Sequence, residues 1–183
     1  MTTFGRKMNA RSNRAAPPLL CAVLVIASAS AQAFPLTAET RARYLAVANQ
    51  AHDAGQITDR QLRDTRRWLN LQPCSSARTA LDANRKFELA RAISESEGFP
   101  NSTVLTYIGF QSWHIVLTTA GLGDPPYLVY REDPAKGGKP VASWAGAATI
   151  FETTELRDWL LANAPGIPGR LADCWAWHVT LGQ

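Results

Sequence analysis

The pattern of the chain changes at Pro100, and this change constrains the fold more than any other feature of the sequence. Residues 34–99 show helical periodicity, whereas residues 100–183 are mainly short runs of β-branched and aromatic residues separated by turn residues. Helices followed by consecutive strands with short links are typical of an α+β fold with an antiparallel sheet. We therefore expect N-terminal helices packed on a C-terminal antiparallel sheet of about five strands.

The helices have recognisable start signals. Thr37 is placed to cap the first helix, and Thr58 with Gln61 three residues later forms a capping box for the second. Ser75 or Ser76 is expected to cap the third. The predicted helices span 38–54, 59–71, 77–97 and, beyond Pro100, 153–164.

The predicted strands follow a two-residue alternation of apolar and polar side chains. Gln111 and Ser112 read as the turn of a hairpin. The last strand places four large apolar side chains on one face and His178 on the other. The predicted strands span 103–110, 113–119, 127–131, 141–144 and 175–181.

The first 33 residues have the three parts of a secretory signal. Four basic residues precede an apolar run over 19–27, and Ala31-Gln32-Ala33 forms an A-x-A cleavage site. The apolar run is shorter than the roughly 20 residues that a stable membrane anchor needs. We expect cleavage after residue 33, a periplasmic or secreted protein without a membrane anchor, and a single globular domain over 34–183.

The net positive charge of the chain belongs to this signal. Residues 1–33 hold four of the 19 Lys and Arg residues and no acidic residue, so residues 34–183 have 15 of each sign. A nucleic-acid binder presents a basic face to the phosphates. The balanced charge gives no indication of such a face, and no nucleic-acid partner is expected.

Residues 34–183 contain two cysteines, Cys74 and Cys174. Two cysteines in an oxidising compartment most often pair. A loop of this length contributes about 4–5 kcal/mol in the chain-entropy model. We predict a structural disulfide that joins the helical half to the sheet half.

A catalytic alternative starts from the same cysteine. Cys74 falls at a predicted helix N-terminus, where the helix dipole lowers the pKa of a thiol, and His114 falls at the start of a strand. Cys74-Ser75-Ser76 and Trp113-His114-Ile115-Val116 resemble the Cys and His segments of papain-like hydrolases, including NlpC/P60-type peptidases. The resemblance covers these two short stretches. It implies a cysteine hydrolase acting on peptide or cell wall, with Cys74 as nucleophile and His114 as base.

The histidines also raise the question of a metal. If the strands of His114 and His178 are neighbours, the two rings meet, but zinc requires a third ligand. No Asp, Glu or Cys has a spacing that supplies it. We expect no metal site and no cofactor.

The remaining candidates are exposed aromatic residues. Trp113 and Trp144 fall near strand ends, and Tyr127 and Arg131 bound a strand between two polar loops, where binding sites are often placed. The sequence has no G-x-S-x-G, H-E-x-x-H or P-loop motif. The leading hypothesis is therefore an exported, non-catalytic protein that binds another protein or a cell-wall component through these four residues. An inhibitor or immunity-type protein is one form of it, and the cysteine hydrolase is the alternative.

Overall fold

The computed structural model describes residues 36–119 and 123–181. This part of the chain contains five α-helices, two short 3-10 helices and four strands. The α-helices are α1 (Ala38–Asp53), α2 (Asp59–Trp68), α3 (Ala83–Glu97), α4 (Thr153–Asn163) and α5 (Gly169–Leu181). The 3-10 helices and strands are η1 (Pro73–Ser76), β1 (Val104–Phe110), β2 (Trp113–Thr118), β3 (Tyr127–Tyr130), η2 (Pro134–Lys136) and β4 (Pro140–Trp144). The predicted mixed α+β fold is confirmed, but the helices lie at both ends of the sequence.

The four strands form one antiparallel sheet in the order β1-β2-β3-β4. The predicted turn between the first two strands is confirmed, since Phe110 pairs with Trp113 across it. Gln111 has a φ of 54°, a left-handed conformation that a tight turn requires. Sequential strands joined this way need little chain between them, so every strand lies beside its neighbour in sequence.

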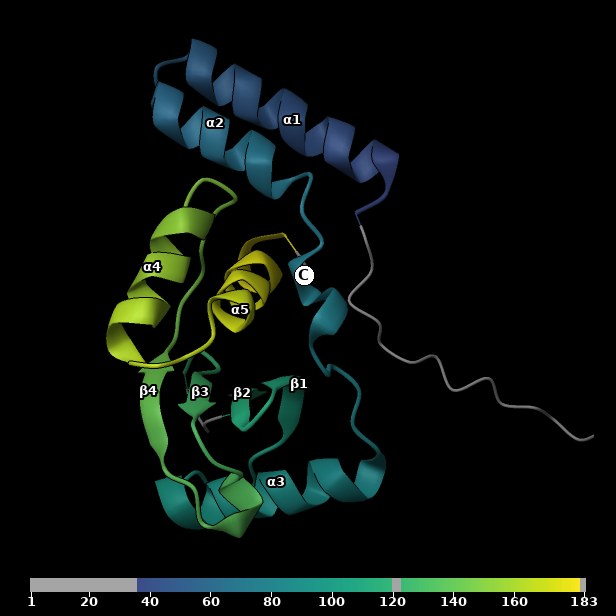
Figure 1. The fold of residues 1–183 in the computed structure, drawn as a ribbon, viewed down its shortest axis with the longest axis vertical. Coiled ribbons are helices and arrows are strands. Elements are labelled where there is room, and N and C mark those ends of the chain that lie inside the picture. Colours follow the sequence, from purple (N-terminus) through teal and green to yellow (C-terminus); the bar gives the residue numbers. More distant parts are fainter. Residues whose placement is uncertain (1–35, 120–122, 182–183) are drawn as a thin grey trace, which may run out of the picture.

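The elements stack in four layers (Figure 1). The α1–α2 hairpin lies on α4 and α5, these two helices cover one face of the sheet, and α3 covers the opposite face. Both faces of the sheet are therefore buried. This explains why β3 reads as four consecutive buried residues instead of an alternation.

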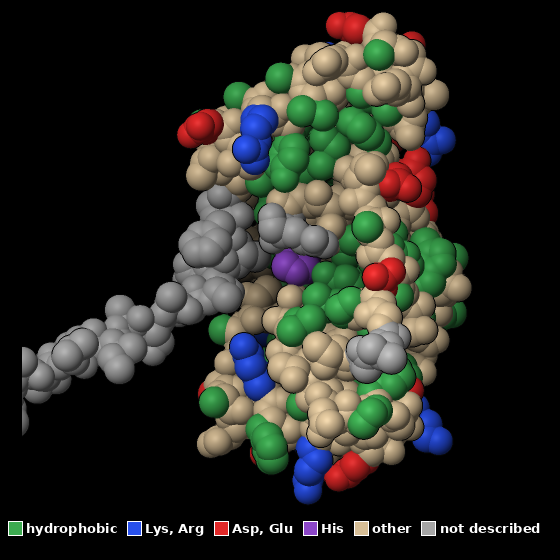
Figure 2. Space-filling view, turned by 180° about the vertical axis from the view of Figure 1, so that it is seen from behind, with side chains coloured by type: hydrophobic (Ala, Val, Ile, Leu, Met, Phe, Trp, Pro, Cys, Tyr) green, Lys and Arg blue, Asp and Glu red, His purple; other side chains and the backbone are tan. Residues whose placement is uncertain are grey.

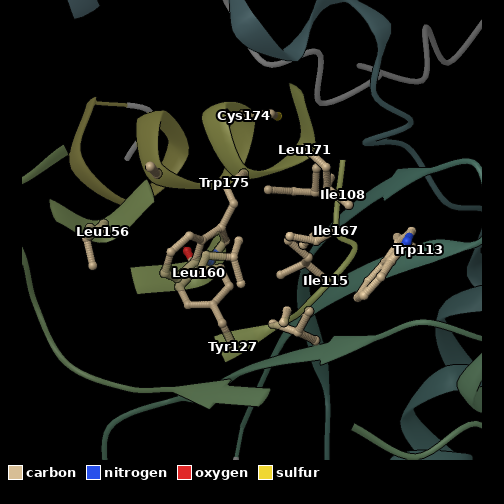
Figure 3. Close-up of a cluster of buried hydrophobic side chains, with 14 of the residues drawn as sticks. Ile108, Trp113, Ile115, Tyr127, Leu156, Leu160, Ile167, Leu171, Cys174 and Trp175 are labelled. Carbon is tan, nitrogen blue, oxygen red and sulfur yellow. The ribbon is translucent and has the colours of Figure 1, made fainter. Parts of the chain in front are cut away.

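The largest core lies between the sheet and the α4–α5 layer (Figure 3). Trp175 of α5 is fully buried at its centre, with Tyr127 of β3 below it and Leu160 of α4 beside it. The Trp175 ring meets the rings of Tyr127, Trp144 and Trp159 at centroid distances of 5.9, 5.7 and 5.9 Å. The contacts with Tyr127 and Trp144 are edge-to-face and the contact with Trp159 is tilted, and such aromatic contacts favour a single arrangement of the core.

The α1–α2 hairpin forms as its caps predict. The Thr37 hydroxyl accepts from the backbone N–H of Thr40 at 3.1 Å. The Thr58 hydroxyl accepts from the Gln61 N–H at 3.2 Å, and the Gln61 side chain accepts from the Thr58 N–H at 3.0 Å. Both predicted helix starts are confirmed. They are predictable from sequence because each capping hydrogen bond closes within four residues of the chain. Trp68 then packs the hairpin against α5.

The predicted last strand over 175–181 is wrong, because this segment is the second half of α5. Trp175 and Val179 are four residues apart and face the sheet. Trp177 and Leu181 are also four residues apart, and they face the α1–α2 hairpin. A helix covered on two sides thus reproduces the two-residue alternation of a strand. Because this segment is not a strand, the sheet has four strands and not the expected five or so.

The third helix begins later than predicted. Residues 73–76 form η1, and Arg78 then makes an isolated bridge to Gly109 of β1. Helix α3 starts at Ala83, where the Asp82 carboxylate accepts from the N–H of Arg85 at 2.7 Å. Asp82 is the cap instead of Ser75 or Ser76 because the bridge at Arg78 keeps the chain after η1 extended.

The predicted disulfide is confirmed: Cys74 of η1 is bonded to Cys174 of α5, with Cα atoms 4.7 Å apart. The bond joins the segment that leaves the α1–α2 hairpin to the helix at the centre of the fold. The predicted signal over 1–33 lies outside the described residues. Within 36–119 and 123–181, no helix has the length and apolar composition needed to cross a membrane.

Candidate functional site

The aromatic residues proposed for binding lie largely in the core. Trp113 and Tyr127 are 5% and 3% exposed, and Trp144 is half-buried against the Trp175 ring. Figure 3 shows Trp113 at the side of the same cluster that holds Tyr127. Arg131 is exposed, and its guanidinium carbon stands 5.7 Å from the centre of the Trp113 ring. These side chains mainly pack against one another, so little of the rings is left for a partner.

The structure does not bring Cys74 and His114 together. Cys74 packs against the core that Trp113 and Ile115 line on the α4–α5 side of the sheet. His114 lies between these two residues in β2 and points to the opposite face, where the next residue of the same parity, Val116, packs against α3. In the disulfide, Cys74 also has no thiolate. The arrangement that the papain-like resemblance implies is therefore not formed.

The structure also separates His114 from His178. His178 belongs to α5, on the other side of the sheet. Among the described residues, no group of three His, Cys, Asp or Glu side chains is placed to hold a metal ion.

His114 lines a pocket of about 420 Å³ on the α3 side of the sheet. The pocket lies between the N-terminal turn of α3, the segment before it, strands β1 and β2, and the residue that precedes η2. Its lining residues are Arg78, Ala80, Leu81, Asp82, Arg85, Tyr107, His114 and Asp133. Five of these eight can carry a charge or titrate near the physiological range, which makes it a polar site on a largely apolar sheet.

A hydrogen bond between Tyr107 and His114 forms the floor of the pocket. The Tyr107 hydroxyl lies 2.7 Å from Nδ1 of His114, and both side chains are buried. The register explains the contact, since Gly109 is the direct partner of His114 and Tyr107 lies two residues before it on the same face. A Cβ at Gly109 would stand 2.4 Å from the Tyr107 hydroxyl oxygen. Glycine is therefore required for Tyr107 to reach across to His114.

Arg78 lies beside this pair, at the edge of the sheet. Its backbone N–H and C=O each pair with Gly109 at 2.8 Å, which holds its Cα against β1. Its Nη2 donates to the Tyr107 hydroxyl oxygen at 3.5 Å. No ion pair joins Arg78 to a carboxylate among the described residues. Among the charged side chains of the lining, Arg78 and Asp82 thus have no opposite charge in direct contact, and Arg78 is the cation of the two.

The two carboxylates of the pocket are engaged by the protein. Asp82 caps α3, and Asp133 accepts from the Arg85 guanidinium and from the N–H of Ala135. Burial opposes ionisation of Asp133, but the Arg85 and Ala135 hydrogen bonds hold its pKa below its usual value. Arg85 also bonds to Glu88 at 3.0 Å, so this guanidinium is shared between two acids.

Burial determines the charge of the two residues on the floor. It lowers the pKa of His114, and Arg78 and Arg85 add to this effect, which Asp133 opposes. Burial also raises the pKa of Tyr107, although the same two arginines oppose it. Near neutral pH, His114 is therefore a neutral imidazole and Tyr107 a neutral phenol.

A second hollow of about 560 Å³ lies between α3 and η2. Arg85 lines both hollows, and it is paired with Asp133, which lines the first. The two hollows therefore adjoin each other along α3. We call the two hollows together the α3 groove. Its second part is lined by Arg85, Glu88, Arg91, Ala92, Glu95, Ser96, Pro134, Ala135, Lys136 and Gly137.

Sequence reasoning missed most of this groove. The sequence indicates His114 only as a partner of Cys74 or of His178. The predicted hairpin turn at 111–112 already pairs 109 with 114, so it contained a signal that Tyr107 lies diagonally opposite His114. Nothing in the sequence indicated Arg78 or Asp133, because tertiary contacts place both.

No protein-family model matches the sequence, and searches of curated proteins and of solved structures also found no match.

Proposed function

We propose that this protein is an exported, non-catalytic protein that binds another protein, and that it does so through the α3 groove. The observation that carries the proposal is the groove itself, two adjoining hollows lined by charged side chains of both signs. Small-molecule sites are mostly enclosed and apolar, with a few polar groups. An open groove with many charged groups suits an extended polypeptide segment better.

The lining of the His114 pocket supports a binding role over a catalytic one. None of its eight lining residues is a Ser, Thr, Cys or Lys, so the imidazole has no aliphatic hydroxyl, thiol or amine within the pocket to activate as a nucleophile. The surface charge also favours a specific protein contact. On the face in Figure 2, basic and acidic side chains are interspersed, and neither sign forms a continuous patch.

Export is part of the proposal. It is supported by the signal pattern of residues 1–33 and by the Cys74–Cys174 bond, which an oxidising compartment maintains. We expect the exported protein to begin at Phe34, as N-terminal sequencing of periplasmic or secreted material would show. A chain that still begins at Met1 or Met8 would contradict export by cleavage.

Site-specific photocrosslinking tests the groove. A photoreactive amino acid at Ala92, in the groove, is expected to give a protein adduct in the producing cells. The same residue at Ala46, exposed on α1, is the matched control and should give none. The adduct is identified by mass spectrometry, and the purified partner should then bind the wild-type protein in solution. Equal adducts from both positions, or none from Ala92, would contradict the proposal.

A further inference from the structure

We propose that the pocket formed by Arg78, Tyr107 and His114 is the anchor of the α3 groove, and that it holds a side-chain carboxylate of the bound segment. This inference rests on the proposed function, because it assigns the partner chemistry of the same groove. It predicts an Asp or Glu residue at one end of the recognised sequence.

Arg78 supplies the positive charge that would bind the carboxylate. The guanidinium lines the pocket and has no carboxylate partner among the described residues, whereas Arg85 in the same wall has two. An arginine fork matches the planar geometry of a carboxylate and binds it through two parallel hydrogen bonds. The backbone pairing with Gly109 fixes the base of this side chain before a ligand arrives, which reduces the ordering that binding requires.

The hydrogen bonds at Tyr107 favour one direction. Arg78 can only donate, so the Tyr107 oxygen accepts from it. The Tyr107 proton is then best used toward Nδ1 of His114, because this direction employs both the phenol O–H and the ring nitrogen. A neutral imidazole that accepts at Nδ1 carries its proton on Nε2. Nε2 has no hydrogen-bond partner among the described residues. The pocket thus offers two kinds of donor, the guanidinium N–H groups and the imidazole Nε2–H, to one acceptor group.

The acids of the pocket do not occupy these donors. Asp82 accepts from the N–H of Arg85 as the cap of α3, and Asp133 accepts from the Arg85 guanidinium and the Ala135 N–H. A carboxylate from outside therefore meets Arg78 without displacing an internal carboxylate. The volume of about 420 Å³ lies within the range of about 300–1,000 Å³ that ligand sites have, and it admits an acidic side chain with part of its backbone.

The test uses two short peptides that differ in one group, acetyl-Gly-Gly-Glu-Gly-Gly-amide and the same peptide with Gln. Binding to the purified exported protein is followed by NMR titration of its backbone amide and His114 ring signals. We expect saturable shifts around Arg78 and His114 with the Glu peptide. The Gln peptide should bind at least about tenfold more weakly, which corresponds to about 1.4 kcal/mol.

Variants assign the effect to the pocket. Arg78→Gln should reduce affinity for the Glu peptide about tenfold, whereas Arg63→Gln, an exposed arginine of α2, should leave it unchanged. Tyr107→Phe should weaken binding without changing the charge of the pocket, because it removes the group that orients the imidazole proton. This variant keeps the inference testable if Arg78→Gln perturbs the fold.

The outcomes separate this inference from the proposed function. Equal affinity for the two peptides, an Arg78→Gln protein that binds like wild type, or no saturable binding of the Glu peptide each overturns the carboxylate anchor. A crosslink from Ala92 would still support the groove as a protein-binding site. Conversely, selective binding of the Glu peptide with no adduct from Ala92 keeps the anchor and removes the proposed function.

Discussion

The Cys74–Cys174 bond is predicted to be a main source of the stability of the fold. The two cysteines are 100 residues apart in the sequence, and the loop between them contains α3, the whole sheet and α4. In the chain-entropy model, closing a loop of about 100 residues contributes about 4.7 kcal/mol, and removal of native disulfides typically costs about 2–5 kcal/mol. We expect Cys74→Ala to lower the free energy of unfolding by about 2–5 kcal/mol.

The double-mutant cycle sharpens this prediction. Either single substitution breaks the bond, so the Cys74→Ala, Cys174→Ala double variant should be only slightly less stable than either single one. Cys174 is fully buried, and its replacement by Ala also leaves a small void. Cys174→Ala should therefore be the more destabilising single change by a modest margin.

Urea unfolding without reductant measures these differences, with the reduced wild-type protein as a matched control for loss of the bond alone. The reasoning is refuted if reduction leaves the unfolding midpoint unchanged, or if the two single effects add in the double variant. Alkylation of the native protein gives an independent check. A carbamidomethyl group on Cys74 alone would show a free thiol there and return attention to the cysteine hydrolase alternative.

Three further predictions concern the caps, the pocket floor and the histidines. Thr58→Ala should destabilise the protein by about 0.5–2 kcal/mol through loss of the capping box, and an unchanged denaturation curve would contradict this. Gly109→Ala should break the Tyr107–His114 hydrogen bond, because the new methyl group overlaps the phenol. The NMR signals of the His114 ring should then shift. Unchanged signals would mean that the backbone of the strand moves to accommodate the methyl group and the hydrogen bond is kept. Burial lowers the pKa of His114 and of His178. As the pH falls through about 6.5, these histidines therefore take up protons more readily in the unfolded chain than in the folded protein. The free energy of unfolding should decrease in this range. Unfolding curves between about pH 7.5 and 5, where carboxylates remain ionised, should show this loss, and replacing both histidines by Gln should flatten it.

Part of the fold could be predicted because its causes are local. The helix starts at Thr37 and Thr58 depend on hydrogen bonds that close within four residues, so the residues themselves are sufficient. The hairpin turn at Gln111 depends on a two-residue link between alternating runs. The disulfide was predictable for a different reason, since residues 34–183 contain two cysteines and so allow only one pairing within them.

The errors arose where the surroundings decide the conformation. The segment from Trp175 to Leu181 carries an apolar residue at every second position, which is typical of a strand. It is a helix because two layers cover it, one from the sheet and one from the α1–α2 hairpin, and each layer takes side chains four residues apart. The spacing of apolar residues in such a segment therefore cannot distinguish a strand with one buried face from a helix with two buried faces.

The sequence by itself determined the mixed α+β class, two helix caps, one hairpin turn and the disulfide across the fold. The first three depend on residues that are close in the chain, and the disulfide depends on there being only one possible pair of cysteines within residues 34–183. Tertiary structure alone decided the candidate site. Arg78 precedes α3, Tyr107 and His114 lie on two strands, and Asp133 follows the third strand. These residues meet only because the strands pair in one register and α3 packs on that face. The sequence pattern alone does not show that these side chains, which are far apart in the chain, lie close together in the fold.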